Sequence, residues 1–180
     1  MVNDDSGWLI AQYFAQLVLC AVFAQSFIAK LRDSNGFRQS LKNYRLVPNR
    51  YSHGAAFLVI LAEATAIILL TFHPSLLALG FELSLALLSL FSLAIATALY
   101  RQIDLTCGCF GQTSQTNYLD LVRNAILIGI AILGTVSLQQ HRYVFDLPLF
   151  ALSVPPALLV SFAMSNLKSV VEALRFSAVH

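Results

Sequence analysis

Two of the three cysteines in this chain stand one residue apart, in the segment Cys107-Gly108-Cys109-Phe110-Gly111. A thiolate at such a pair can attack a disulfide, and two thiolates together can hold a soft metal ion such as Cu(I). Gly108 permits the tight backbone that a bond between cysteines two positions apart requires. We interpret Cys107 and Cys109 as a thiol–disulfide redox pair. Cu(I) binding, and a turn whose small residues simply pack, stay open as alternatives.

Positive charge close to a cysteine favours the thiolate, which is the reactive form. Arg101 and Arg123 flank the pair in the sequence. Asn117 can cap a helix that starts after the pair, with Asp120 three residues later, and a helix N-terminus carries partial positive charge. We therefore predict that Arg101 and Arg123 stabilise a thiolate at the pair.

The chain that must position these residues is 180 residues long, with 58% apolar and 11% charged residues. Soluble domains carry about a quarter charged residues, so this composition predicts a membrane protein. Three cysteines are too few for an extracellular domain held together by disulfides. The sequence contains no glycine-rich phosphate loop, no Ser-His-Asp order and no nucleic-acid-binding pattern. We expect a single integral-membrane domain over residues 1–180.

Five hydrophobic stretches have close to the ~20 residues that a helix needs to cross a bilayer. They cover residues 8–28, 55–72, 76–100, 118–138 and 147–167. The fourth stretch carries Asp120 and Arg123 at its interfacial end, and the fifth contains Pro155-Pro156, which predicts a kink or a break. The predicted fold is an all-α, up-and-down bundle of four to five transmembrane helices.

The basic residues predict the orientation of this bundle, because Lys and Arg concentrate in cytoplasmic loops. Ten of the eleven basic residues fall on one side of the predicted topology, and Arg142 alone falls on the other. The N-terminus is then outside and the C-terminus inside. The cysteine pair lies on the cytoplasmic side, or folds back into the membrane from that side.

The first cytoplasmic loop contains two rows of residues at helical spacing. They are apolar Phe37, Leu41 and Tyr44, and basic Arg38, Lys42 and Arg45. Rows with this spacing form adjacent faces of a short amphipathic helix, which Pro48 would end. Such a helix can lie on the inner leaflet or pack on the bundle, and the pattern is compatible with both.

Polar residues inside the predicted spans are candidates for function, because hydrocarbon offers them no partner. Gln12, Gln16 and Cys20 follow one another at intervals of four, so they should line the bundle interior. Cys20 is either a small buried residue or a resolving thiol, and the second role requires the cysteine loop to dip toward the bilayer centre. Glu63, near the middle of the second span, is a candidate proton relay or an interhelical hydrogen-bond anchor. Glu82 is nearer the outer interface and is expected to be structural.

The order and spacing of three motifs resemble one known family. In the first loop they are Lys30-Leu31-Arg32-Asp33, Gly36-Phe37, Leu41 and Tyr44-Arg45-Leu46-Val47-Pro48. In the second span Glu63 matches the family's recurrent membrane acid. The segment 107–111, followed by Leu121-Val122-Arg123-Asn124, matches its cysteine motif and the helix after it. Over about residues 10–140 the chain thus resembles the methylamine utilisation protein MauE, which is grouped with DoxX-like, redox-associated membrane proteins.

The resemblance implies a protein of the bacterial inner (cytoplasmic) membrane that serves methylamine metabolism. Its role would be processing, transport or maturation of the small (beta) subunit of methylamine dehydrogenase, by disulfide formation or isomerisation. A thioredoxin-like partner similar to MauD is also implied. If the protein is an enzyme, it is a thiol-disulfide oxidoreductase; we assign no cofactor or metal ligands, and the sequence does not indicate a quinone. The alternatives are DoxX-like thiol redox for another client and a non-catalytic assembly factor.

The predicted position of the pair conflicts with this client, whose disulfides form outside the cell membrane. The loop can re-enter the membrane and relay electrons through Cys20. The protein can instead carry reductant outward, so that wrong disulfides are isomerised. The third resolution is that the fourth span is misread.

Overall fold

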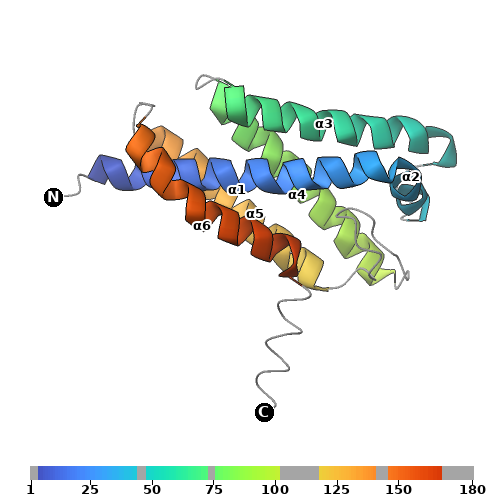
Figure 1. The fold of residues 1–180 in the computed structure, drawn as a ribbon. Coiled ribbons are helices and arrows are strands. Elements are labelled where there is room, and N and C mark those ends of the chain that lie inside the picture. Colours follow the sequence, from blue (N-terminus) through green and yellow to red (C-terminus); the bar gives the residue numbers. More distant parts are fainter. Residues whose placement is uncertain (1–3, 44–47, 73–75, 102–117, 141–145, 168–180) are drawn as a thin grey trace, which may run out of the picture.

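The computed structural model of the protein describes residues 4–43, 48–72, 76–101, 118–140 and 146–167. In these ranges the chain is helical and contains no β-strand. The helices are α1 (Asp4–Arg32), α2 (Ser34–Asn43), the short 3₁₀ helix η1 (Asn49–Tyr51), α3 (Ser52–Phe72), α4 (Leu77–Tyr100), α5 (Tyr118–Gln140) and α6 (Leu147–Ser165) (Figure 1).

Five of these helices, α1, α3, α4, α5 and α6, are long and apolar enough to cross a membrane. Each lies within a few residues of one predicted stretch, so the prediction of an all-α membrane bundle is confirmed, with five spans rather than four. The fourth predicted span is a continuous helix of 23 residues.

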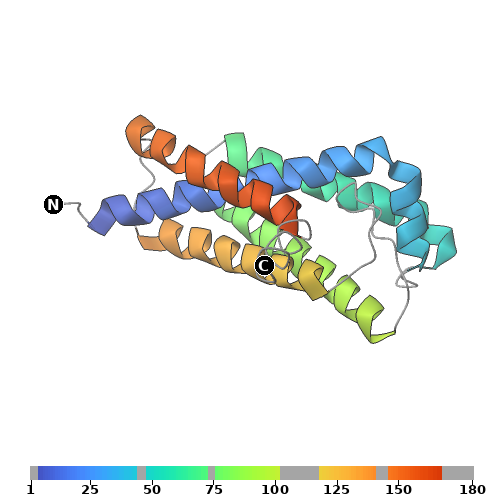
Figure 2. The same ribbon diagram turned by 60° about the horizontal axis from the view of Figure 1, so that its bottom comes forward.

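Helix α1 lies at the centre of the bundle. It packs against α3, α5 and α6, and α4 packs against α3 and α5. Figures 1 and 2 show α1 running the length of the molecule with α3 on one side and α6 crossing it on another. The stretch of α1 that α6 covers is bounded by Tyr13, whose hydroxyl accepts a hydrogen bond from Asp146 N, and by Gln25, which accepts one from Ser165.

The apolar core joins α1 to its neighbours through buried side chains such as Leu19, Phe23 and Leu127. Two glycines let helices approach closely. A Cβ at Gly134 of α5 would collide with the buried ring of Phe81, and one at Gly80 would press on Leu70. Small residues at such positions allow the van der Waals packing that holds helices together in lipid, where the hydrophobic effect between helices is weak.

Hydroxyl groups inside the spans are largely satisfied within their own helices. Ser84 Oγ donates to Gly80 O at 2.7 Å, and Thr135 Oγ1 donates to Ala131 O at 2.9 Å. This back-bonding to the preceding turn removes the cost of placing a hydroxyl in an apolar environment.

The predicted break in the fifth span is wrong. Helix α6 is continuous through Pro155-Pro156. Both prolines are exposed on the outer face of the bundle, so their rings do not press on a neighbouring helix. Asp146 fixes the start of the helix, because its Oδ1 accepts a hydrogen bond from Leu149 N at 3.2 Å.

The short first-loop helix is confirmed as α2, and it packs on the bundle. Asp33 ends α1 and begins α2: its N–H donates to Ala29 O at 3.1 Å, and its Oδ1 accepts from Gly36 N at 2.9 Å. The apolar row is anchored by Phe37, which is buried, whereas Leu41 is half-buried. Tyr44 and Arg45 lie outside the described residues.

Candidate functional site

A buried charge pair links α1 to α3. Lys30 is 1% exposed and Glu63 is fully buried, and Lys30 Nζ contacts Glu63 Oε1 as both an ion pair and a hydrogen bond. Ser26 Oγ donates to the same carboxylate oxygen at 2.9 Å and accepts from Lys30 Nζ at 2.8 Å. The three side chains therefore form a closed network in which each group contacts the other two.

Two aromatic rings complete the surroundings of the Lys30 ammonium group. Its Nζ lies 4.7 Å from the ring centroid of Phe91 on α4 and 5.2 Å from that of Phe37 on α2. Ring faces attract cations, and the attraction grows when water is excluded. Lys30 is thus held by four helices: its own, α3 through Glu63, and α2 and α4 through the rings.

The two oxygens of the Glu63 carboxylate differ in their hydrogen bonds. Oε1 accepts both hydrogen bonds of the network, while the buried Oε2 has no hydrogen-bond partner among the described residues. A carboxylate has lone pairs on both oxygens, so the acceptor capacity of Oε2 is unused among the described residues.

The sequence predicts a role for Glu63 but not its partner, because Lys30 falls among the basic residues that predict the orientation of the bundle. A signal was nevertheless present, because Gln12 and Lys30 are 18 residues apart, which is about five turns at 3.6 residues per turn. Lys30 therefore continues the inward face that Gln12 begins.

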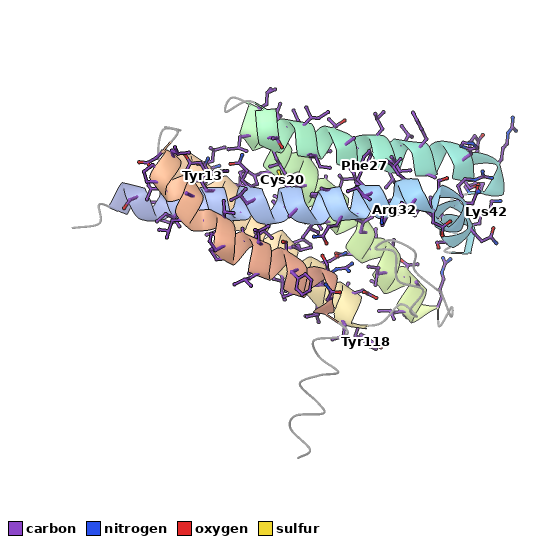
Figure 3. All side chains as sticks on the ribbon, in the orientation of Figure 1. Tyr13, Cys20, Phe27, Arg32, Lys42 and Tyr118 are labelled. Atoms are coloured by element: carbon purple, nitrogen blue, oxygen red, sulfur yellow. The ribbon has the colours of Figure 1, made fainter. Side chains whose placement is uncertain are left out.

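Cys20 lies near the other end of α3 from the first-loop helix (Figure 3). It is half-buried, and its Sγ is 3.6 Å from Thr71 Oγ1. The Thr71 hydroxyl also donates to Ile67 O at 2.6 Å, so this contact joins Cys20 to the last turns of α3. Thr71 stands eight residues after Glu63, about 12 Å along the helix axis. Cys20 and Glu63 therefore belong to different levels of the bundle.

The two glutamines of the first span are in the bundle, as the spacing predicts. Gln12 is fully buried, and neither amide atom has a partner among the described residues. Gln16 is half-buried and donates from Nε2 to Leu70 O at 2.6 Å. Leu70 is in the last turn of α3, where carbonyls lack a helical partner, so Gln16 supplies the missing donor.

The predicted thiolate stabilisers occupy different environments. Arg101 is exposed directly after α4. Arg123 is 8% exposed, and its Nη1 lies 3.9 Å from Asp120 Oδ1 one turn earlier on α5. Part of its positive charge is therefore balanced within its own helix, which weakens its effect on a thiolate.

Cys107 and Cys109 lie outside the described residues, as does Asn117. The described chain ends before them at Arg101 and resumes after them at Tyr118. The end of α4 and the first-loop helix point toward the same end of the bundle (Figure 1). Phe91, which contacts Lys30, is nine residues before Tyr100, or about 14 Å along α4.

We call the level of Ser26, Lys30 and Glu63 the charged end of the bundle, and the level of Gln12, Gln16 and Cys20 the glutamine end. Each is a polar group on the inward side of α1. Between them α1 presents Val22 and Phe23, which are buried in the apolar core. In the chain, the cysteine segment follows α4 and precedes α5.

Comparison with known proteins gives a consistent match. The sequence model of the family described as methylamine utilisation protein MauE matches residues 8–137, which run from α1 to nearly the end of α5. Methylamine utilization protein MauE of Methylophilus methylotrophus is 34% identical over 151 residues, covering 83% of this chain and 73% of that protein. The protein of the same name from Paracoccus versutus is 33% identical over 129 residues, covering 69% and 68%. No solved structure matches the chain.

Proposed function

The chain belongs to the MauE family of methylamine utilisation proteins, and from that membership we propose that it matures the small subunit of methylamine dehydrogenase by thiol–disulfide chemistry. It is a membrane protein with five helices able to span a bilayer. In this proposal it lies in the bacterial inner membrane, with the N-terminus outside and the C-terminus in the cytoplasm. A thioredoxin-like protein similar to MauD is its redox partner.

The reaction uses Cys107 and Cys109 as a pair. The thiolate of one cysteine attacks a disulfide, a mixed disulfide forms, and one thiolate of the attacked protein leaves. The second cysteine then attacks the mixed disulfide, so that the pair becomes oxidised and the other protein is reduced. The reverse sequence oxidises the client. In both directions two electrons pass between the pair and a dithiol or disulfide of the client or partner.

The observation that carries the proposal is the family match, since it covers both the cysteine motif and the helices that bury Lys30 and Glu63. Thiol–disulfide exchange takes a proton from the attacking thiol and returns one to the leaving thiolate. Glu63 is assigned the role of proton relay, with Oε2 as the receiving atom. Arg101 and Arg123 are assigned the weaker role of stabilising the thiolate.

The position of Cys20 supports direct exchange with a partner over a relay through this thiol. Cys20 is at the level of Thr71, at the end of α3 that adjoins the start of α4. The cysteine segment follows the opposite end of α4, a helix of 24 residues and about 36 Å in length. A resolving reaction with Cys20 would require the pair to reach back along most of that length.

The test compares the double variant Cys107→Ser/Cys109→Ser with the single variant Cys20→Ser. An alkylation-shift assay on membranes reports the oxidation state of the pair, and the activity of purified methylamine dehydrogenase reports maturation. We expect the wild-type pair to change oxidation state when client and partner are present. Maturation should be lost in the double variant and kept in Cys20→Ser.

The alternatives give different results in the same experiment. Full maturation in the double variant, together with a wild-type pair that never changes oxidation state, would contradict the redox role and favour an assembly factor that only docks the client. Loss of maturation in Cys20→Ser, with the protein level unchanged, would restore the relay. A pair that cycles while the dehydrogenase matures normally in both variants would indicate another client.

A further inference from the structure

The Lys30–Glu63 pair is enclosed on one side by the long helix α4 and on another by the short helix α2. Phe91 belongs to α4, a long helix packed against α3 and α5. Phe37 belongs to α2, a helix of ten residues that leaves α1 at the single residue Asp33. We propose that α2 is a cover that controls proton exchange at the Lys30–Glu63 pair, with Phe37 as its closing contact. That the cover serves thiol–disulfide exchange rests on the proposed function. That α2 covers the Lys30–Glu63 pair does not depend on it.

The unused carboxylate oxygen shows where the proton binds. Glu63 Oε1 holds both Lys30 and Ser26, and Oε2 has no partner among the described residues. One proton added to Oε2 converts the carboxylate to a carboxylic acid while Lys30 stays an ammonium ion. The charge of the network then rises by one unit, and the same proton leaves when the carboxylate is restored.

The two rings explain how the bundle tolerates this change. If Glu63 were always ionised, its carboxylate alone would compensate the charge of Lys30. When Glu63 is protonated, the ammonium group instead depends on Ser26 Oγ and on the faces of Phe37 and Phe91. The surroundings of Lys30 therefore suit a carboxyl group that alternates between its charged and neutral forms.

The other charged groups near this end leave α2 as the side from which a proton arrives. Arg32 and Asp33 are exposed at the junction of α1 and α2, and Arg38 is half-buried beside Phe37.

On α3, His53 is exposed at the first turn. Helix α4 carries one charged residue, the exposed Glu82, which lies far from Phe91 along the helix. On α5, Asp120 and Arg123 contact each other. Exposed charged side chains thus lie at the α2 side, where the buried ring of Phe37 packs over the Lys30 ammonium group.

Chemical labelling of Glu63 in full-length protein in membranes tests this proposal. Carbodiimides react with a carboxyl group only when it is protonated. Lipid-soluble N,N′-dicyclohexylcarbodiimide reports protonation of Glu63, and a water-soluble carbodiimide reports access from water. Mass spectrometry of the Glu63 peptide gives the rate for each reagent, with the exposed Glu82 as an internal reference.

We expect Phe37→Ala to raise the rate of labelling by the water-soluble reagent about tenfold, because the closing contact is lost. The matched control is Phe57→Ala, the same change at an exposed position of α3, which should leave the rate unchanged. Phe91→Leu should lower labelling by the lipid-soluble reagent, since it removes a ring from the ammonium without opening the cover. Where Phe37→Ala is too unstable, Phe37→Leu should give a smaller increase in the same direction.

Two results would overturn the cover. One is equal labelling of Glu63 by the water-soluble reagent in wild type and Phe37→Ala, both folded by circular dichroism. The other is a Glu63 that never reacts with the lipid-soluble reagent under conditions where Glu82 does. The rates should be the same in the Cys107→Ser/Cys109→Ser background, because the cover needs no thiol. Failure of the cover therefore leaves the redox proposal standing, and failure of the thiol experiment leaves the cover standing.

Discussion

The charged end and the glutamine end of α1 both bury polar side chains in the bundle, but different interactions stabilise them. At the charged end, Lys30 and Glu63 are buried in mutual contact, and Ser26 and two rings support them. At the glutamine end, Gln16 caps α3, Gln12 is buried without a partner among the described residues, and the helices meet closely at Gly134. One end is held by charge and the other by close packing. A substitution should therefore reveal which end it affects through the size and sign of its effect.

The largest effect should come from removing one member of the charge pair. Lys30→Met leaves the Glu63 carboxylate buried without its cation, and breaking a buried pair in this way costs about 3–5 kcal/mol. The double variant Lys30→Met/Glu63→Met should recover most of that loss, since both charges are gone. Unfolding in detergent, followed by circular dichroism, gives the free energy of unfolding. A single variant as stable as wild type would mean that the charged end is not held by the pair.

Gly134→Ala tests the packing of the other end and should have the second largest effect. The new methyl group meets the buried ring of Phe81, and overpacking of this kind costs about 1–3 kcal/mol. The control is Gly129→Ala on the same helix, where a Cβ has open space and alanine favours the helix. If the two variants have the same melting temperature, the helices are not held closely at Gly134.

A smaller loss is expected for Gln16→Leu. The variant removes the donor to Leu70 O and leaves a helix-end carbonyl unpaired, which costs about 1 kcal/mol. Its effect should be additive with that of Lys30→Met, because the two sites have no shared partner. Strong coupling between them in a double-mutant cycle would show that the two ends act as one network.

The smallest effect, with the opposite sign, belongs to Gln12→Leu. An amide that is buried without partners gains about 0–1 kcal/mol when an apolar side chain of similar size replaces it. We expect the melting temperature to stay the same or to rise. A clear decrease would mean that Gln12 has a partner that the described residues do not include.

Much of the fold could be predicted from the sequence because hydrocarbon imposes one strong rule. Apolar stretches of sufficient length must be helices, and this identified all five spans. The predicted break at the double proline did not occur, although each proline removes one hydrogen bond of its own helix. Pro155-Pro156 face outward, so α6 continues through them.

The candidate site was harder to predict from the sequence than the fold. Glu63 stands out as a charge inside an apolar run, but Lys30 stands at the end of its run, where a basic residue is ordinarily exposed. Its pairing depends on contact between residues 33 positions apart, which no local pattern encodes. The roles of Cys107 and Cys109 remain a prediction from their spacing and their family, to be decided by the thiol experiment.

The pairing of Lys30 with Glu63 also sets an order for the assembly of the protein during its synthesis. When α1 leaves the ribosome and enters the membrane, the carboxylate that will neutralise Lys30 has not yet been made. Until then Lys30 is a cation without its carboxylate partner, and such a cation is costly to place in hydrocarbon. It becomes a buried residue only after α3 has inserted beside it. The burial of this ammonium group in α1 therefore depends on a helix that is synthesised later.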